Sequence, residues 1–157
     1  MTGINDDLSR FIQAQANTYA PALAQLRAGR KTGHWMWFIF PQVAGLGRSA
    51  MSRQYAIRSA NEARAYLDHP VLGARLRECT DALRSHAGKS IEVMLGSVDA
   101  MKLRSSMTLF AHVAGPGERF GTCLEEFFGG QPDAETLRLL GELDQLPLAI
   151  APAAFKP

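Results

Sequence analysis

The chain has 157 residues, 46% of them hydrophobic and 20% charged, with a formal net charge of +2; this composition fits one globular domain and argues against disorder. No apolar run approaches the ~18 residues that a membrane helix needs. The N-terminal sequence MTGINDDLSR has two acids and no apolar core, so we do not expect it to act as a signal peptide. We therefore expect a cytoplasmic protein with no membrane partner.

The first two helices are predicted from apolar residues at helical spacing. Asn5 and Asp6 are suited to cap a helix that runs to about Asn17. Pro21 fits the first turn of a second helix, which Gly29 ends. A short basic link then leads into the most hydrophobic part of the chain.

Residues 34–42, HWMWFIFPQ, form a dense apolar block that contains both tryptophans. Because the run from Trp35 to Phe40 is uninterrupted, its periodicity does not separate a buried strand from a buried helix. The helical surroundings favour a short buried helix that ends before Pro41. The loop after it, VAGLGRS at 43–49, matches neither a dinucleotide-binding motif nor a Walker phosphate loop.

A helical turn over 51–57 is followed by a sequence that matches a capping box. Ser59 stands at the N-cap and Glu62 three residues later, and the helix that they begin runs to about Asp68. Pro70 opens the next helix. The local signals thus predict consecutive helices rather than strands.

The second half of the chain continues the helical pattern, without a pair of alternating segments joined by a hairpin turn. We expect residues 1–146 to form a single all-α, multihelical domain and residues 147–157 to form a Pro- and Ala-rich C-terminal tail. The predicted helices run from Pro70 to about His86 with Gly88 as the cap, over 91–95 after the cap Ser90, from Ser97 to before Pro116, over 120–127, and after the cap Asp133.

Five sequence blocks carry a resemblance to a known family: HWMWFIFPQ at 34–42, GLGRS at 45–49, SRQYAI at 52–57, EARAYLDHPVLGARL at 62–76 and KLRSSMTLF at 102–110. Together they resemble the bacterial and fungal DUF1810 family over roughly residues 5–140. The resemblance implies a multihelical fold with central buried helices. That family is uncharacterised, so no catalytic residues carry over. Its members are sometimes labelled calpastatin, but such protease inhibitors are disordered repeat chains, and this sequence is the opposite.

The aromatic block supplies the first candidate ligand contacts. The rings of Trp35 and Trp37 are suited to stack on a ligand, with His34 and Gln42 at the edges of the block. The alternative is that both tryptophans anchor the core and that His34 is a hydrogen-bonded structural residue. On a helix, positions i and i+2 point in different directions, so the two rings share a pocket only if the segment is extended or lies at a corner.

The second candidate set is Asp99, Lys102, Ser105 and Ser106. Positions 99, 102 and 106 share a helix face, with Ser105 at its margin. They are suited to bind a polar substrate, or to arrange Ser106 as a nucleophile with Lys102 as its base. The alternative is an acid at a helix N-terminus, a snorkelling lysine and small serines that allow close packing. No GxSxG motif surrounds either serine.

Arg48, Ser49 and Tyr55 beside the glycine loop complete the candidate set, with Arg48 as the preferred contact for an anion. The histidines show no metal-binding spacing, and the cysteines form no CxxC pair, so we expect no metal and no cofactor. Cys79 and Cys123 are expected to be reduced structural thiols.

The charge is unevenly distributed along the chain. Residues 1–58 carry seven Lys or Arg against two acids, a net charge of +5, whereas residues 118–157 carry three against seven, a net charge of −4. This pattern favours an anionic ligand near the aromatic block, or a solvated basic face that pairs with the acidic part. The basic residues are dispersed, so we expect no nucleic-acid partner.

The leading hypothesis is a domain that binds a small polar or anionic metabolite in a cleft, and this class includes nucleotide-like ligands. The hypothesis leaves open whether the protein also hydrolyses the ligand. The alternative is a protein-interaction or self-association module without catalytic activity. The residues leave open which ligand is bound, whether the protein is an enzyme and what its oligomeric state is.

Overall fold

The structure is a computed structural model that describes residues 3–150 and the side chains of residues 8–142. Within these residues the chain forms ten helices and no strand, which confirms the all-α fold class. None of these described helices combines the length and the apolar character that crossing a membrane requires. In chain order they are α1 (Gly3–Gln15), α2 (Tyr19–Ala28), α3 (Met36–Ile39), α4 (Ala50–Gln54), α5 (Ala60–Asp68), α6 (Leu72–Arg84), α7 (Ile91–Leu95), α8 (Ser97–Ala114), α9 (Arg119–Phe128) and α10 (Ala134–Ile150).

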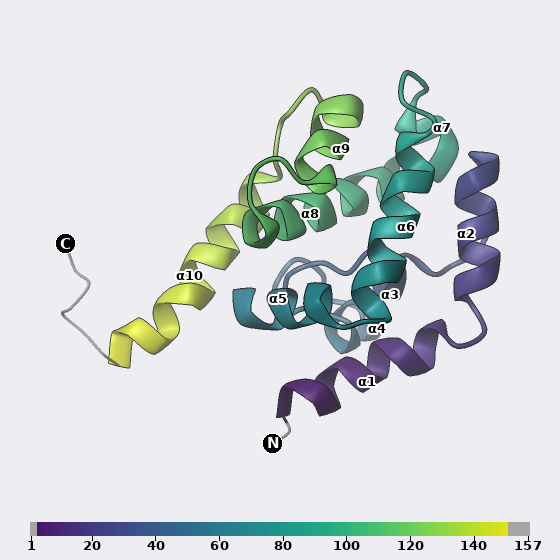
Figure 1. Cartoon of the computed structure of the whole chain (residues 1–157). Helices are drawn as coiled ribbons and strands as arrows, with labels where there is room; N and C mark the ends of the chain where they lie inside the picture. The colour runs from purple at the N-terminus through teal and green to yellow at the C-terminus, as the bar shows by residue number, and fades with distance from the viewer. Residues whose placement is uncertain (1–2, 151–157) are drawn as a thin grey trace.

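Helix α8 runs through the middle of the fold (Figure 1). It packs against α5, α7, α9 and α10 and also contacts α3. Every residue from Ser105 to Phe110 is buried. Apolar side chains therefore occupy more than one face of α8, as predicted for a largely buried helix.

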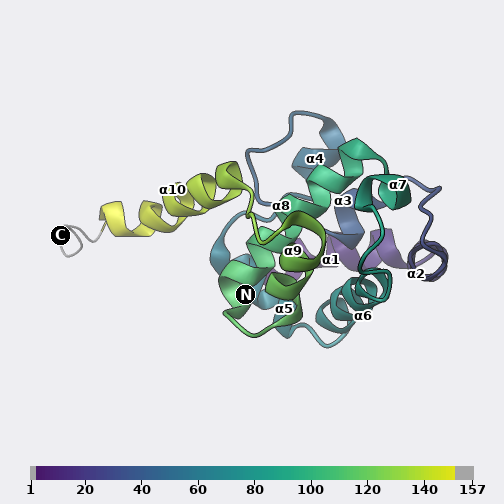
Figure 2. The ribbon, with the colours of Figure 1, turned by 90° about the horizontal axis from the view of Figure 1, so that it is seen from above.

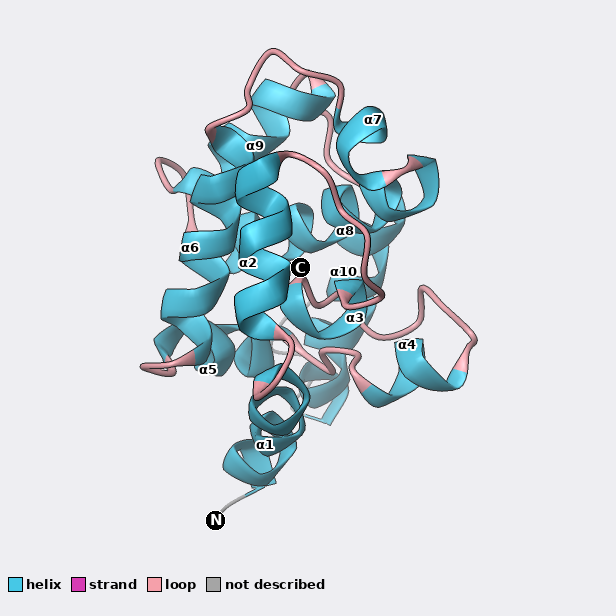
Figure 3. Ribbon diagram, turned by 90° about the vertical axis from the view of Figure 1, so that its right-hand side faces the viewer, coloured by secondary structure: helices cyan, strands magenta, loops and turns pink. Residues whose placement is uncertain are grey.

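Helix α6 contacts α2, α5 and α9. Helices α2 and α6 lie side by side, and α4 stands with its flanking loops at one side of the molecule (Figure 3). The contact between α5 and α6 depends on Gly73, where a β-carbon would lie 2.0 Å from the carbonyl oxygen of Leu67. Only a residue without a β-carbon allows this approach without a shift of the backbone.

The aromatic segment 34–42 contains the predicted short helix, α3, which ends at Ile39, before Pro41. Helix α3 packs against α1, α6 and α8, so the segment lies in the core. Its buried hydrophobic side chains are Trp35, Met36, Phe38, Ile39 and Phe40.

The helix caps follow the sequence closely. Ser59 Oγ accepts a hydrogen bond from the Glu62 backbone N–H at 3.0 Å. Glu62 Oε1 in turn accepts from the backbone N–H of Arg58 at 2.7 Å, one residue earlier than a capping box predicts. Ser90 and Asp133 also cap their helices as predicted, by accepting from backbone N–H groups at 3.2 and 2.9 Å.

Several helix boundaries differ from the predicted ones. Helix α6 begins at Leu72 and not at Pro70, which lies in the turn before it. Helix α1 begins at Gly3, before Asn5 and Asp6, whose side chains lie outside the described part of the chain. Helix α6 ends at Arg84, and turns rather than helix connect it to Gly88. Helix α10 continues to Ile150, beyond the expected start of the tail, because its leucine-rich sequence favours helix more than one proline opposes it. The end of α10 projects from the body (Figure 2), and the domain division itself stays a prediction.

Candidate functional site

Two adjoining cavities lie beside the loop at 43–49. The small cavity lies between the aromatic segment, this loop and residues 52–58, and the large cavity extends from the loop to helix α8. The small cavity has a volume of about 230 Å³ and the large cavity about 650 Å³. We call the two together the cleft, because they share Trp37, Gln42, Leu46, Gly47 and Ser52. The small cavity is also lined by residues 43–45, Arg53, Tyr55, Ala56 and Arg58, and the large cavity by Arg48, Ser49, Val98, Met101, Lys102, Ser105, Asp133 and Glu135.

The loop over the cleft is held at its start by an isolated parallel bridge between Val43 and Ile57. The Ile57 N–H donates to the Gln42 carbonyl, and the Ala44 N–H donates to the Ile57 carbonyl, both at 2.8 Å. These two hydrogen bonds tie the loop to the segment that follows α4. Sequence reasoning did not predict this bridge, since one pair of residues carries no periodic signal.

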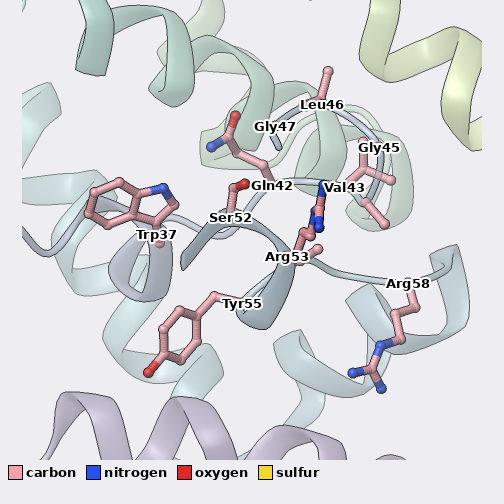
Figure 4. A pocket seen from close by; sticks show the side chains of 12 residues that line it. Trp37, Gln42, Val43, Gly45, Leu46, Gly47, Ser52, Arg53, Tyr55 and Arg58 are labelled. Atoms are coloured by element: carbon pink, nitrogen blue, oxygen red, sulfur yellow. The ribbon is translucent and has the colours of Figure 1, made fainter. Parts of the chain in front are cut away.

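Glycine lets the loop fold back onto α4. A β-carbon at Gly47 would lie 2.6 Å from Ser52 Oγ, a separation that real β-carbons do not show. Ser52 also donates its backbone N–H to the Ser49 hydroxyl at 3.1 Å, which caps α4. Figure 4 shows the loop arching past Ser52, so that the cleft is walled by the loop on one side and α4 on the other.

Trp37 stands where the two cavities meet, and Lys102 lies against it. The Lys102 Nζ is 4.3 Å from the centroid of the Trp37 ring, within the range of a cation–π contact. The same Nζ lies 3.5 Å from Asp99 Oδ1. The lysine is therefore held between a ring face and a carboxylate.

Asp99 joins this contact to a second lysine–tryptophan pair. Its Oδ2 lies 2.7 Å from the Nζ of Lys31, which is itself 4.9 Å from the centroid of the Trp35 ring. The Lys31 side chain is only 6% exposed and that of Asp99 19% exposed. One carboxylate thus serves two ammonium groups, each of which lies over a tryptophan. This carboxylate does not line the cleft but sets the position of Lys102, which does.

Trp35 belongs to the core and not to the cleft. Its side chain is 2% exposed, and its indole N–H donates to Gln25 Oε1 at 2.9 Å. The same oxygen accepts from the backbone N–H groups of Thr32 and Gly33. The hypothesis that both tryptophans line a site is therefore corrected. The two rings point in different directions, as positions i and i+2 do around a short helix.

The serines of α8 are also divided between the cleft and the core. Ser105 lines the large cavity, and its hydroxyl donates to the Met101 carbonyl at 3.2 Å. Ser106 is fully buried, lines neither cavity, and its hydroxyl has no hydrogen-bond partner among the described residues. The face of α8 toward the cleft therefore comprises positions 98, 101, 102 and 105. Ser106, considered above as a nucleophile with Lys102 as its base or as a small residue that allows close packing, lies outside this face.

The other candidate residues separate in the same way. Arg48 and Ser49 line the large cavity, and Tyr55 lines the small cavity while its ring packs against Phe38 at 5.2 Å between centroids. His34 is exposed and lines neither cavity. Among the described residues no group of three His, Cys, Asp or Glu is placed to hold a metal ion.

The acidic residues of the large cavity are engaged elsewhere. Asp133 Oδ2 accepts from the backbone N–H and from the hydroxyl of Thr136, which caps α10. Glu135 pairs with Arg138, which lowers the pKa of the Glu135 carboxyl. Arg48, in contrast, forms no ion pair or hydrogen bond within the described part of the chain. Sequence reasoning missed Asp133 and Glu135 as lining residues, because only the packing of α10 on α8 brings them there.

Comparison with known proteins places this cleft within a shared family region. A family model described as a protein of unknown function, DUF1810, matches residues 5–140, which include every residue of the cleft. The chain is also similar to the conserved hypothetical protein Rv1873 from Mycobacterium tuberculosis, whose crystal structure superposes with a TM-score of 0.84 at 49% sequence identity. That match covers 86% of this chain and 96% of the other. No curated protein matches the sequence.

Proposed function

The chain belongs to the DUF1810 family of proteins of unknown function, and from the chemistry of the cleft we propose that it binds a small anionic metabolite with a planar ring, of the nucleotide-like class. One observation carries the proposal. Trp37 borders both cavities and holds the Lys102 ammonium 4.3 Å from its ring centroid, so an aromatic surface and a cation face the same space.

Each part of such a ligand meets a matching group. Stacking of a base on an aromatic side chain contributes about 1–3 kcal/mol, and the part of the Trp37 ring that Lys102 does not cover provides the surface for it. Arg48 provides a guanidinium group, whose planar fork suits phosphate or carboxylate. Asp133 accepts a hydrogen bond at the N-terminus of α10, and Glu135 pairs with Arg138. Their negative charges are therefore partly compensated, and they repel an anion in the cleft less than two unpaired carboxylates would.

Binding, and not hydrolysis, is the activity that these residues support. The described lining of the cleft contains neither histidine nor cysteine. The Ser105 hydroxyl donates to a backbone carbonyl, and the Lys102 ammonium lies beside a carboxylate and a ring, so neither is arranged as a nucleophile with its base. A cytoplasmic location belongs to the same proposal, and the free, buried thiols of Cys79 and Cys123 support it.

A thermal-shift and calorimetric screen with nucleotides, ADP-ribose and sugar phosphates tests the proposal. We expect at least one nucleotide to stabilise the wild type, and Arg48→Met to weaken its binding about tenfold or more, because charge-assisted hydrogen bonds have that value. Arg30→Met is the matched control, since Arg30 is also exposed and lines neither cavity. The proposal fails if no compound binds, or if both substitutions have the same effect.

A second candidate function rests on exposed apolar side chains at the rim of the large cavity. Val98 and Met101 are 64% and 69% exposed, which suits a protein-interaction or self-association surface. Sedimentation velocity over a range of concentrations measures self-association directly. If the wild type assembles, Met101→Glu abolishes the assembly and no nucleotide binds, this function replaces the first.

A further inference from the structure

The small cavity is basic, although it is too small to be a ligand site by itself. Its volume of about 230 Å³ is below the ~300 Å³ at which ligand pockets begin. Among the residues that the structure describes, its lining includes Arg53 and Arg58 and no acid, and Arg58 already takes part in another interaction. Its chemistry therefore suits a single anionic group that belongs to a larger ligand.

Arg53 is the side chain best placed to bind that group. Figure 4 shows its guanidinium directed toward the loop near Val43, whereas Arg58 lies at the far edge of the cavity. Arg53 is exposed and forms no ion pair with any residue that the structure describes. Ser52 lines the same cavity, and its hydroxyl donates to the Ser49 carbonyl at 2.9 Å.

The large cavity contains a second, separate basic end. Arg48, which forms no ion pair within the described part of the chain, lines it together with Lys102, which pairs with Asp99, and its two acids are engaged with α10 and Arg138. Its volume of about 650 Å³ lies within the range of sites for whole small molecules. An anionic group and the neutral body of a ligand therefore fit here.

The strip between the two basic ends is neutral. The five residues that line both cavities are Trp37, Gln42, Leu46, Gly47 and Ser52, none of which is charged. Trp37 adds a ring face to this strip, and Gln42 adds an amide that both donates and accepts hydrogen bonds. The cleft thus has the order basic, neutral with an aromatic ring, basic.

From this order we infer that the ligand has two separated anionic groups, and that it is a nucleotide with two phosphates on different positions of its sugar rather than one. One phosphate binds Arg53 in the small cavity, the other binds Arg48 and Lys102 in the large cavity, and the nucleoside lies across Trp37. The inference rests on the proposed function and names the substrate class of the same site.

The test compares adenosine, adenosine 5′-monophosphate and adenosine 3′,5′-bisphosphate by isothermal titration of the full chain. We expect the bisphosphate to bind about tenfold more tightly than the monophosphate, because one more charge-assisted contact forms. Arg53→Met should remove this advantage and leave monophosphate binding within about twofold, whereas Arg48→Met should weaken both. Arg53→Lys should keep part of the advantage, and Arg30→Met should change neither ligand.

The outcomes separate this inference from the proposed function. The inference is wrong if the monophosphate and the bisphosphate bind with equal affinity, or if Arg53→Met weakens the binding of both equally. In either case the site takes one anionic group, and the proposed function stands. If no compound of the thermal-shift and calorimetric screen binds the wild type, the proposed function fails, and the inference fails with it. Circular dichroism of each variant shows whether it keeps the helical fold.

Discussion

The carboxylate of Asp99 is the first test of how this site is supported. Asp99→Ala removes the partner of Lys31, whose Nζ lies 2.7 Å from Asp99 Oδ2 and whose side chain is 6% exposed. Breaking a fully buried ion pair costs about 3–5 kcal/mol, and an exposed pair contributes about 0–1 kcal/mol. Because Asp99 is 19% exposed, we expect a loss of about 2–3 kcal/mol in the free energy of unfolding. For a chain of this length that loss lowers Tm by about 4–12 °C.

Urea denaturation and scanning calorimetry measure this loss. Asp68→Ala is the control, since Asp68 is exposed and forms no ion pair among the described residues; its substitution should change stability by less than about 0.5 kcal/mol. Lys31→Met combined with Asp99→Leu should recover most of the loss, because no unpaired charge then stays buried. The reasoning is refuted if Asp99→Ala is as mild as Asp68→Ala, or if the double variant is no more stable than Asp99→Ala.

Two further predictions concern the core. Gly73→Ala should lower the free energy of unfolding by about 3 kcal/mol or more, because its β-carbon would lie 2.0 Å from a backbone oxygen. At the control position Gly121 a β-carbon would meet no described atom within 4 Å beyond the nearby backbone of its own helix, so Gly121→Ala should change that free energy by less than about 1 kcal/mol in the same urea titration. Burial raises the pKa of Cys79 and Cys123 from 9.0 to about 12. Between these pH values the thiols ionise in the unfolded chain but not in the folded one, so the free energy of unfolding should be constant below pH 9 and fall as the pH rises to about 12. In Cys123→Ala the slope of this fall should be smaller. A slope that the substitution leaves unchanged would contradict the assignment.

The helices and their caps are each determined by a short stretch of sequence. Ser59 caps α5, Gly29 ends α2 with a φ of 74°, and Ser90 caps α7, each as predicted. Such signals work because a cap or an apolar stripe involves residues within one or two helical turns. The resemblance of five short blocks also identified the family, and the family match over residues 5–140 confirms it.

The candidate residues are divided between the cleft and the rest of the molecule. The sequence pointed to Trp37, Gln42, Arg48, Lys102 and Ser105, and these residues do line the cleft. It pointed equally to Trp35, His34 and Ser106, which do not. Neighbours of the same residue type carry the same local signal, so composition and spacing do not distinguish the one that faces a cavity.

That distinction was decided by tertiary packing. The cleft forms where the loop after α3, the exposed face of α8 and the start of α10 meet, and these segments are far apart in the sequence. The ion pair between Lys31 and Asp99 likewise joins two distant segments and sets the position of Lys102. The sequence alone therefore determined the helices and their caps, since these depend on local hydrogen bonds and on the periodic spacing of apolar side chains. It also determined the family, through five short sequence blocks. Which side chains converge on one cavity depends on how the helices pack, and only the tertiary structure decided it.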